Sequence, residues 1–205
     1  MKTIKMPIHF QFDLDKFIAC ISLFAKEKLN ALDKLKICKL LYFSDKYHLL
    51  KYGKPIIGDT YCHLDNGPIP SRALDIMNEI ICRDKVFSKS QELSSKDKFT
   101  QFIKVKRSVF HKYPVFELQK EPNMDCLSES ELEAVSETIK KYGNLSGGIL
   151  IDETHKDAAW QKTKNTEEID YRLFFDNEPG ADPAALEYLE SLQEDLAIGF
   201  ALSNG

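Results

Sequence analysis

The sequence predicts a mainly α-helical fold with a small β component, in the α+β class. Apolar residues recur at helical spacing in most of the longer segments, whereas alternation typical of a strand is confined to two short stretches. Helix start and stop signals bracket the helical segments. The chain has 205 residues, of which 43% are hydrophobic and 11% aromatic, a composition that suits one compact domain with an appended segment.

The first helix is expected after an irregular leader. Residues 1–12 form this leader because Pro7 disfavours an early helix. Asp13 or Asp15 can cap a helix that continues to about Lys28, with apolar residues along one face.

A long central helix follows. Asn30 and Asp33 have the spacing of a capping box, which predicts that the helix starts there. Its apolar residues cover more than one side, so several neighbours should bury it. Gly53 offers a left-handed C-cap, and Pro55 prevents the helix from resuming.

A turn and a stiff elbow connect this helix to the next. Residues 60–64 suggest a short strand, and residues 65–68 form a turn cluster. Pro68 and Pro70 favour extended backbone and give a rigid entrance to a helix from Ser71 to about residue 83.

The second half is expected to be a hairpin followed by helices. Residues 84–97 are polar and rich in Ser and Lys, which indicates a surface loop, and residues 99–119 suggest a β-hairpin. A capping box at residues 128–131 predicts a helix that ends at Gly143. Ser146 can cap a helix towards Lys162.

The C-terminal part carries most of the acidic charge. We divide the chain into a domain at residues 1–164 and an acidic extension at 165–205, which has ten acidic residues against Arg172 alone. Residues 165–181 look irregular, and Asp182-Pro183 predicts a final helix packed on or beside the domain. The excess acidic charge indicates either a basic partner or simple solvation.

Cysteine usage and hydropathy point to the cytoplasm. The five cysteines are scattered without a Cys-x-x-Cys pair, which favours reduced core thiols over a disulfide or zinc framework. No apolar run approaches the roughly 20 residues of a membrane span, and the N-terminus lacks a signal-peptide pattern. We expect no cofactor, no metal site and no membrane association.

Three histidines are the candidates for an enzymatic alternative. His48 could act as a general base oriented by Asp45, but a polar pair on the helix surface is the favoured interpretation, because no nucleophile is placed beside them in the sequence. His63 could join Asp59, and His155 precedes Trp160, whose large ring needs a pocket with a polar exit for its N–H. An enzyme would require the histidines to converge on one pocket. Without a catalytic motif around them, we expect no enzyme.

A basic segment is the candidate for nucleic-acid binding. Residues 85–112 contain eight Lys or Arg residues with Phe99, Phe102 and Phe110 nearby, a combination that can hold a single strand. The same lysines could instead protect the edge of a hairpin. The overall pI of about 5.8 makes a dedicated nucleic-acid-binding protein the weaker interpretation.

Four short motifs stand in order along the chain. They are Lys39-Leu-Leu-Tyr-Phe-Ser-Asp45, Tyr52-Gly-Lys-Pro-Ile56, Asn66-Gly-Pro-Ile-Pro-Ser71, and Thr154-His155 with Trp160. Together they resemble the SocA/Panacea domain of prokaryotic and phage antitoxins. The resemblance covers about residues 14–162, and Ser44 stands where alanine is usual in the family.

This resemblance implies an antitoxin of a toxin-antitoxin system, of the kind found in prophages and phage defence. It would neutralise a protein toxin encoded by the adjacent gene through direct contact. One alternative is an adaptor that delivers the toxin to a cellular protease, and another is a nucleic-acid-binding regulator.

Residues at the elbow and in the motifs are the expected sites. We expect two surfaces to bind the partner. One is the acidic C-terminal helix, and the other consists of exposed polar residues: Asp59, Tyr61, His63, Asn66, Arg72 and His155. The residues that we expect to hold the scaffold are Leu40, Leu41, Tyr42, Asp45, Gly53, Pro55, Gly67, Pro68, Pro70 and Trp160.

Overall fold

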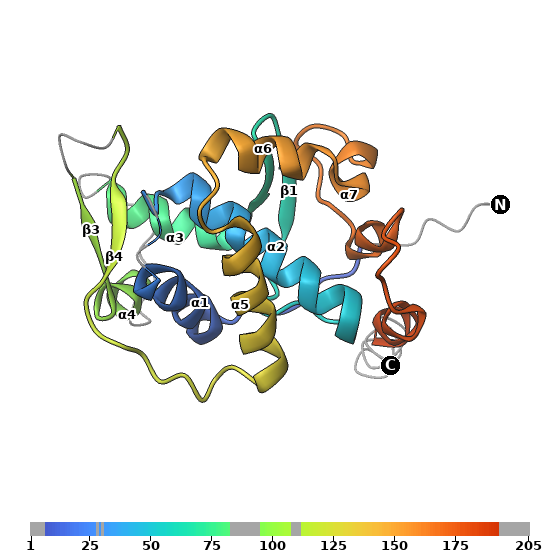
Figure 1. The fold of residues 1–205 in the computed structure, drawn as a ribbon, viewed down its shortest axis with the longest axis horizontal. Coiled ribbons are helices and arrows are strands. Elements are labelled where there is room, and N and C mark those ends of the chain that lie inside the picture. The colour runs from blue at the N-terminus through green and yellow to red at the C-terminus, as the bar shows by residue number, and fades with distance from the viewer. Residues whose placement is uncertain (1–6, 28, 30, 83–94, 108–111, 193–205) are drawn as a thin grey trace, which may run out of the picture.

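The fold is organised around one central helix, α2, as seen in a computed structural model (Figure 1). The structure describes residues 7–27, 29, 31–82, 95–107 and 112–192. Helix α2 (Lys34–Tyr52) contacts α1 (Leu14–Lys26), α3 (Ser71–Ile81), α5 (Glu129–Tyr142) and α6 (Gly147–His155). The mainly α class with a small β component is confirmed, because two antiparallel two-stranded hairpins accompany the helices.

The two N-terminal helices begin at aspartate caps. Asp13 caps α1 by accepting a hydrogen bond from the Lys16 backbone N–H at 3.0 Å. The expected start of α2 at Asn30 is wrong, because Asp33 is the N-cap and accepts from the Lys36 N–H at 2.9 Å. An aspartate side chain directly before the first helical residue reaches the free N–H groups without a box partner. Gly53 ends α2 in the left-handed conformation, as predicted.

The elbow is a hairpin with a third strand-like segment beside it. Strand β1 (Tyr61–Leu64) pairs with β2 (Gly67–Pro70), and β2 leads directly into α3. The other edge of β1 is covered from the distant C-terminal part: the His63 N–H donates to the Glu167 carbonyl at 3.0 Å. The expected irregular segment 165–181 therefore contributes an extended piece and the 3₁₀ helix η1 (Tyr171–Phe175).

The second hairpin lies at the opposite end of the molecule from the C-terminal segment (Figure 1). Strand β3 (Ile103–Lys106) pairs with β4 (Val115–Leu118), as the sequence predicted. The expected surface loop falls largely outside the described residues, and its last part is wrong because residues 95–100 form helix α4 (Ser95–Thr100). Phe99 is fully buried and anchors α4 on the core, a tertiary contact that overrides the polar local pattern.

The helices of the second half follow their predicted starts with one correction. The capping box of Ser128 and Glu131 begins α5, and Ser146 caps α6. The expected continuous helix to Lys162 is wrong, because α6 ends at His155 and Asp157 caps a separate helix, α7 (Ala158–Lys162). Residues 183–192 form the expected final helix.

Two buried apolar clusters make up the core. The first joins α1, α2, α3 and α5 with both hairpins. The second surrounds Tyr42 and Tyr61 and includes Tyr171, Phe174 and Leu189 from the C-terminal segment. Residues after 164 therefore supply fully buried side chains to the core. None of the helices in the described ranges is long and apolar enough to cross a bilayer.

Candidate partner-binding site

The motifs far apart in the sequence meet at the elbow, where Gly67 is the closest point. Gly67 has φ +87°, a left-handed conformation that favours glycine. A Cβ added there would lie 2.3 Å from Thr154 Oγ1 and 2.6 Å from Lys39 Nζ. The turn thus needs glycine both for its backbone angle and for the close approach of α2 and α6.

Lys39 is a buried cation at this junction. Its side chain is fully buried in α2, and its ammonium group donates to the Pro68 carbonyl at 3.0 Å. Burial lowers the pKa of Lys39 to about 8, because removal from water disfavours the charged form. This lysine ties the central helix to the elbow.

Trp160 lies between two imidazole rings. Its ring stacks on His155 at a centroid distance of 3.9 Å and on His63 at 4.3 Å. The indole N–H donates to the Leu64 carbonyl at 3.2 Å, and His63 Nδ1 lies 2.9 Å from the Trp160 carbonyl oxygen. Nε2 of His155 is buried and has no hydrogen-bond partner among the described residues. The stack joins α6, α7 and β1 into one unit.

The expectation that Asp59 and Tyr61 are exposed is wrong. Asp59 is 2% exposed, and its carboxylate accepts from the backbone N–H groups of Arg72 and Ala73 at 2.9 and 2.7 Å. It caps α3, whose preceding residue Pro70 has no side-chain donor or acceptor. Burial raises the pKa of Asp59 despite these donors. Tyr61 is 1% exposed and donates to Asp45.

The interpretation of Asp45 and His48 as a surface pair is also wrong. Asp45 is buried and accepts from the Ile56 and Ile57 N–H groups at 2.8 and 3.0 Å. Burial raises the pKa of Asp45 to about 7, against the effect of these hydrogen bonds. His48 is buried as well, with Nδ1 2.8 Å from the Lys54 carbonyl oxygen. Both residues hold the chain that leaves α2.

The histidines do not converge on one pocket. His48 Nε2 lies 3.0 Å from Ser130 Oγ on α5, whereas His63 and His155 lie on opposite faces of the Trp160 ring. In the described ranges, no group of His, Cys, Asp or Glu residues has a geometry suited to a metal ion, and the cysteines are all free. The enzymatic alternative required the three histidines to meet in one pocket, and they do not.

Comparison with known proteins places this geometry in a family. The model of the family described as "Antitoxin SocA-like, Panacea domain" matches residues 37–161, more than half of the chain. The chain belongs to this antitoxin family. No match is found among curated proteins or among solved structures. The matched range begins inside α2, so α1 lies outside it.

Three of the four SocA-like motifs contribute contacts at the elbow, whereas the motif at residues 52–56 is held by Asp45 through the Ile56 N–H. Residues 39, 67–68, 154 and 160 all lie within the matched range and meet around the Gly67 turn. Sequence reasoning did not single out Lys39 or Thr154 individually. The sequence signal for Lys39 is its position inside the apolar run of residues 37–41. A cation on a buried helix face needs a hydrogen-bond acceptor, which predicts a structural contact for this lysine.

The accessible surface of this SocA-like elbow is smaller than expected. Asn66 and Arg72 are exposed, whereas His63 and His155 are half-buried. A hollow of about 670 Å³ lies beside Asn66 and is lined mainly by apolar side chains, including Leu64, Ile69 and Tyr113, which is 54% exposed. We name this hollow with Asn66 at its edge the elbow face. Arg72 lies at the start of α3 and does not line it.

The basic segment of this SocA-like family member is arranged differently from a single-strand site. Phe99 is fully buried and Phe102 half-buried, while Phe110 lies outside the described residues. Lys104 and Lys106 both pair with Glu117, at 3.4 and 3.2 Å. Base stacking needs exposed aromatic faces. The described part of this segment has cationic side chains but no fully exposed aromatic ring for a base to stack on.

Proposed function

We propose that this member of the SocA-like family is an antitoxin that neutralises a cognate protein toxin by direct contact and performs no catalysis. The toxin would be the product of the adjacent gene. The unpaired cysteines suit a reducing compartment, and we place the protein in the cytoplasm.

The observation that carries this proposal is that the buried polar side chains in and between the motifs bind backbone groups of the scaffold. Lys39 and Asp45 from the first motif, and Asp59 between the second and third motifs, are buried and form hydrogen bonds with the backbone of the elbow and of its neighbours. Rigid scaffolds commonly present binding residues on the loops that they fix. The motif therefore supports a stiff scaffold whose exposed neighbours, such as Asn66, Arg72 and the elbow face, are available for contact.

Delivery of the toxin to a cellular protease is the alternative within this function. Both mechanisms start with a complex, but only delivery lowers the amount of toxin. A nucleic-acid-binding regulator is a weaker alternative, because the pI is about 5.8 and Phe99 is buried.

Coexpression tests the proposal. The chain and the product of the adjacent gene are expressed from separate inducible promoters, and growth and toxin amount are measured together. We expect restored growth with the toxin still present and bound to the chain. Growth with loss of the toxin would favour delivery, and no rescue with no complex would refute the proposed function.

A further inference from the structure

Strand β3 has one open edge. In the antiparallel β3–β4 ladder, Val105 lies opposite Phe116, and the Phe116 N–H points away from β3 to the Leu32 carbonyl at 2.9 Å. Hydrogen-bonded and non-hydrogen-bonded pairs alternate in such a ladder. The N–H and C=O groups of Val105, and by the same alternation those of Ile103, therefore point away from β4. No described residue pairs with them, and the edge is accessible at Val105, which is half-buried, whereas Ile103 is fully buried.

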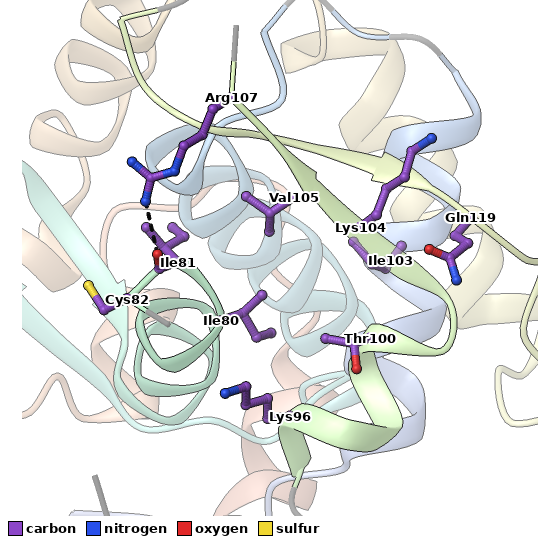
Figure 2. A pocket seen from close by; sticks show the side chains of 10 residues that line it. All are labelled: Ile80, Ile81, Cys82, Lys96, Thr100, Ile103, Lys104, Val105, Arg107 and Gln119. Carbon is purple, nitrogen blue, oxygen red and sulfur yellow. Dashed lines mark hydrogen bonds between the residues drawn. The ribbon is translucent and has the colours of Figure 1, made fainter. Parts of the chain in front are cut away.

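The open edge borders a groove of about 960 Å³ (Figure 2). Helix α4 packs against both α3 and β3 and closes one end. At the other end, Arg107 Nη2 donates to the Ile81 carbonyl at the end of α3, 3.0 Å away. Ile80, Ile81 and Val105 give the groove an apolar lining. Its shape and lining fit a chain laid along β3 between the two ends.

The charges around this groove are positive. Lys96, Lys104 and Arg107 line it, and no acidic residue is part of its lining among the described residues. On the outer face of β3, Lys104 and Lys106 share the single carboxylate of Glu117, and hydrogen bonds from both lysines lower the pKa of Glu117. One carboxylate between two ammonium groups leaves a positive strand edge that favours an acidic neighbour.

We propose that the β3 groove binds an extended segment of the toxin, which adds a strand to the open edge of β3. This inference rests on the proposed function. Strand addition uses main-chain hydrogen bonds for affinity and alternate side chains for specificity. The residue of the segment opposite Val105 is aliphatic and lies over Ile80 and Ile81. Residues opposite Lys104 and Lys106 are acidic.

A protein segment fits this groove better than a nucleic acid does. The unpaired main-chain groups of Val105 match a strand, and the isoleucines match aliphatic side chains. A single strand of nucleic acid would need aromatic platforms, but the ring of Phe99 in α4 is fully buried.

Two variants test the groove. Val105→Pro removes the outward N–H while leaving the ladder bonds of Lys104 and Lys106 intact, and proline is tolerated on edge strands. Lys104→Glu with Lys106→Glu reverses the charge of the outer face. The matched control is Lys140→Glu with Lys156→Glu, because these exposed lysines also pair with one glutamate each on distant helices. Circular dichroism confirms that each variant is folded.

Binding is measured with two probes, the toxin produced by coexpression and a fluorescent octapeptide of alternating glutamate and valine. We expect both groove variants to bind each probe at least about tenfold more weakly. Val105→Pro loses one or two strand hydrogen bonds, and the lysine double variant loses its charge pairing with the acidic residues of the segment. The control should bind as the wild type does. Hydrogen exchange should show protection of the Val105 amide in each complex.

The outcomes separate the two proposals. If wild-type chain binds the toxin and Val105→Pro binds it equally well, the groove inference is overturned and the proposed function stands. If the wild-type chain neither rescues growth nor binds the toxin, the proposed function fails. Binding of the octapeptide then tests separately whether the groove is a peptide-binding site. Failure of the octapeptide to bind in that case, or its displacement by a thymidine oligonucleotide, would overturn the groove inference.

Discussion

Gly67 and Thr154 are in contact although 87 residues separate them in the chain, and the contact leaves no room for a β-carbon on Gly67. The Thr154 hydroxyl donates to the Ile151 carbonyl at 2.8 Å, so it is held in place within α6. The elbow and α6 are therefore fixed to each other, and the placement of the exposed residues near them depends on this contact.

Gly67→Ala should be strongly destabilising. The left-handed backbone and the clash with Thr154 should together lower the free energy of unfolding by about 2–4 kcal/mol. The matched control is Gly148→Ala in α6, where an added Cβ meets nothing within 4 Å. Alanine should stabilise that helix by up to about 1 kcal/mol. Urea denaturation of both variants checks the pair, and equal effects would contradict the packing described for Gly67.

Ser44→Ala should be neutral or stabilising. The Ser44 hydroxyl is buried in α2 without a hydrogen-bond partner among the described residues. Removing it should change the free energy of unfolding by about 0–1 kcal/mol in the stabilising direction. Ser22→Ala is the control, because the Ser22 hydroxyl is equally buried but donates to the Ile18 carbonyl at 2.8 Å. It should not stabilise the protein, and a larger gain there than at Ser44 would count against this assignment.

Asp45 should make stability fall as the pH rises from about 4 to 7. Its pKa is about 7 in the folded protein and 3.8 in its ordinary state, so the folded state holds the proton more tightly. The stabilising contribution is fully present below about pH 4 and is lost as the pH passes through about 7, by as much as about 4 kcal/mol.

Asp45→Asn isolates this contribution. The amide oxygen can still accept from the Ile56 and Ile57 N–H groups, but it does not titrate. The difference in unfolding free energy between the two proteins should therefore change between pH 4 and 7, while Asp59 contributes to both proteins alike. Parallel stability curves for wild type and variant over this range would show that Asp45 keeps an ordinary pKa.

Removal of the C-terminal segment should unfold part of the core. A chain that ends at residue 164 loses Tyr171, Phe174 and Leu189, all nearly or fully buried. Since each large buried side chain is worth about 3–5 kcal/mol, cooperative unfolding should be lost or strongly weakened. A chain that ends at residue 181 keeps η1 and should be intermediate in a thermal melt. Full stability of the shorter chain would contradict the packing of this segment.

The local signals in the sequence predicted most helix starts correctly. Asp13, Ser128 and Ser146 each cap the helix that they were expected to start, because capping depends on two or three neighbouring residues. The break before Asp157 was missed because the apolar pattern continues across it. The cap at Asp157 is held by long-range contacts, including the hydroxyl of Tyr42 at 2.8 Å.

The site was predicted less well than the fold. Asp59 is an aspartate next to a turn, a position that is normally exposed, and its burial follows from a partner 13 residues later in the chain. The stacking of His63 on Trp160 joins residues 97 positions apart. Such contacts depend on how the elements pack, so no local pattern could have revealed them.

Direct inhibition in a purified mixture is the most direct test of the central claim. The toxin is purified free of its partner, and its activity is measured while the intact chain is added in steps. The molecular masses of both proteins are monitored to show that neither is degraded. We predict inhibition that saturates at a fixed molar ratio, with the toxin intact and no other component present. Full toxin activity in a molar excess of the folded chain would contradict neutralisation by direct contact.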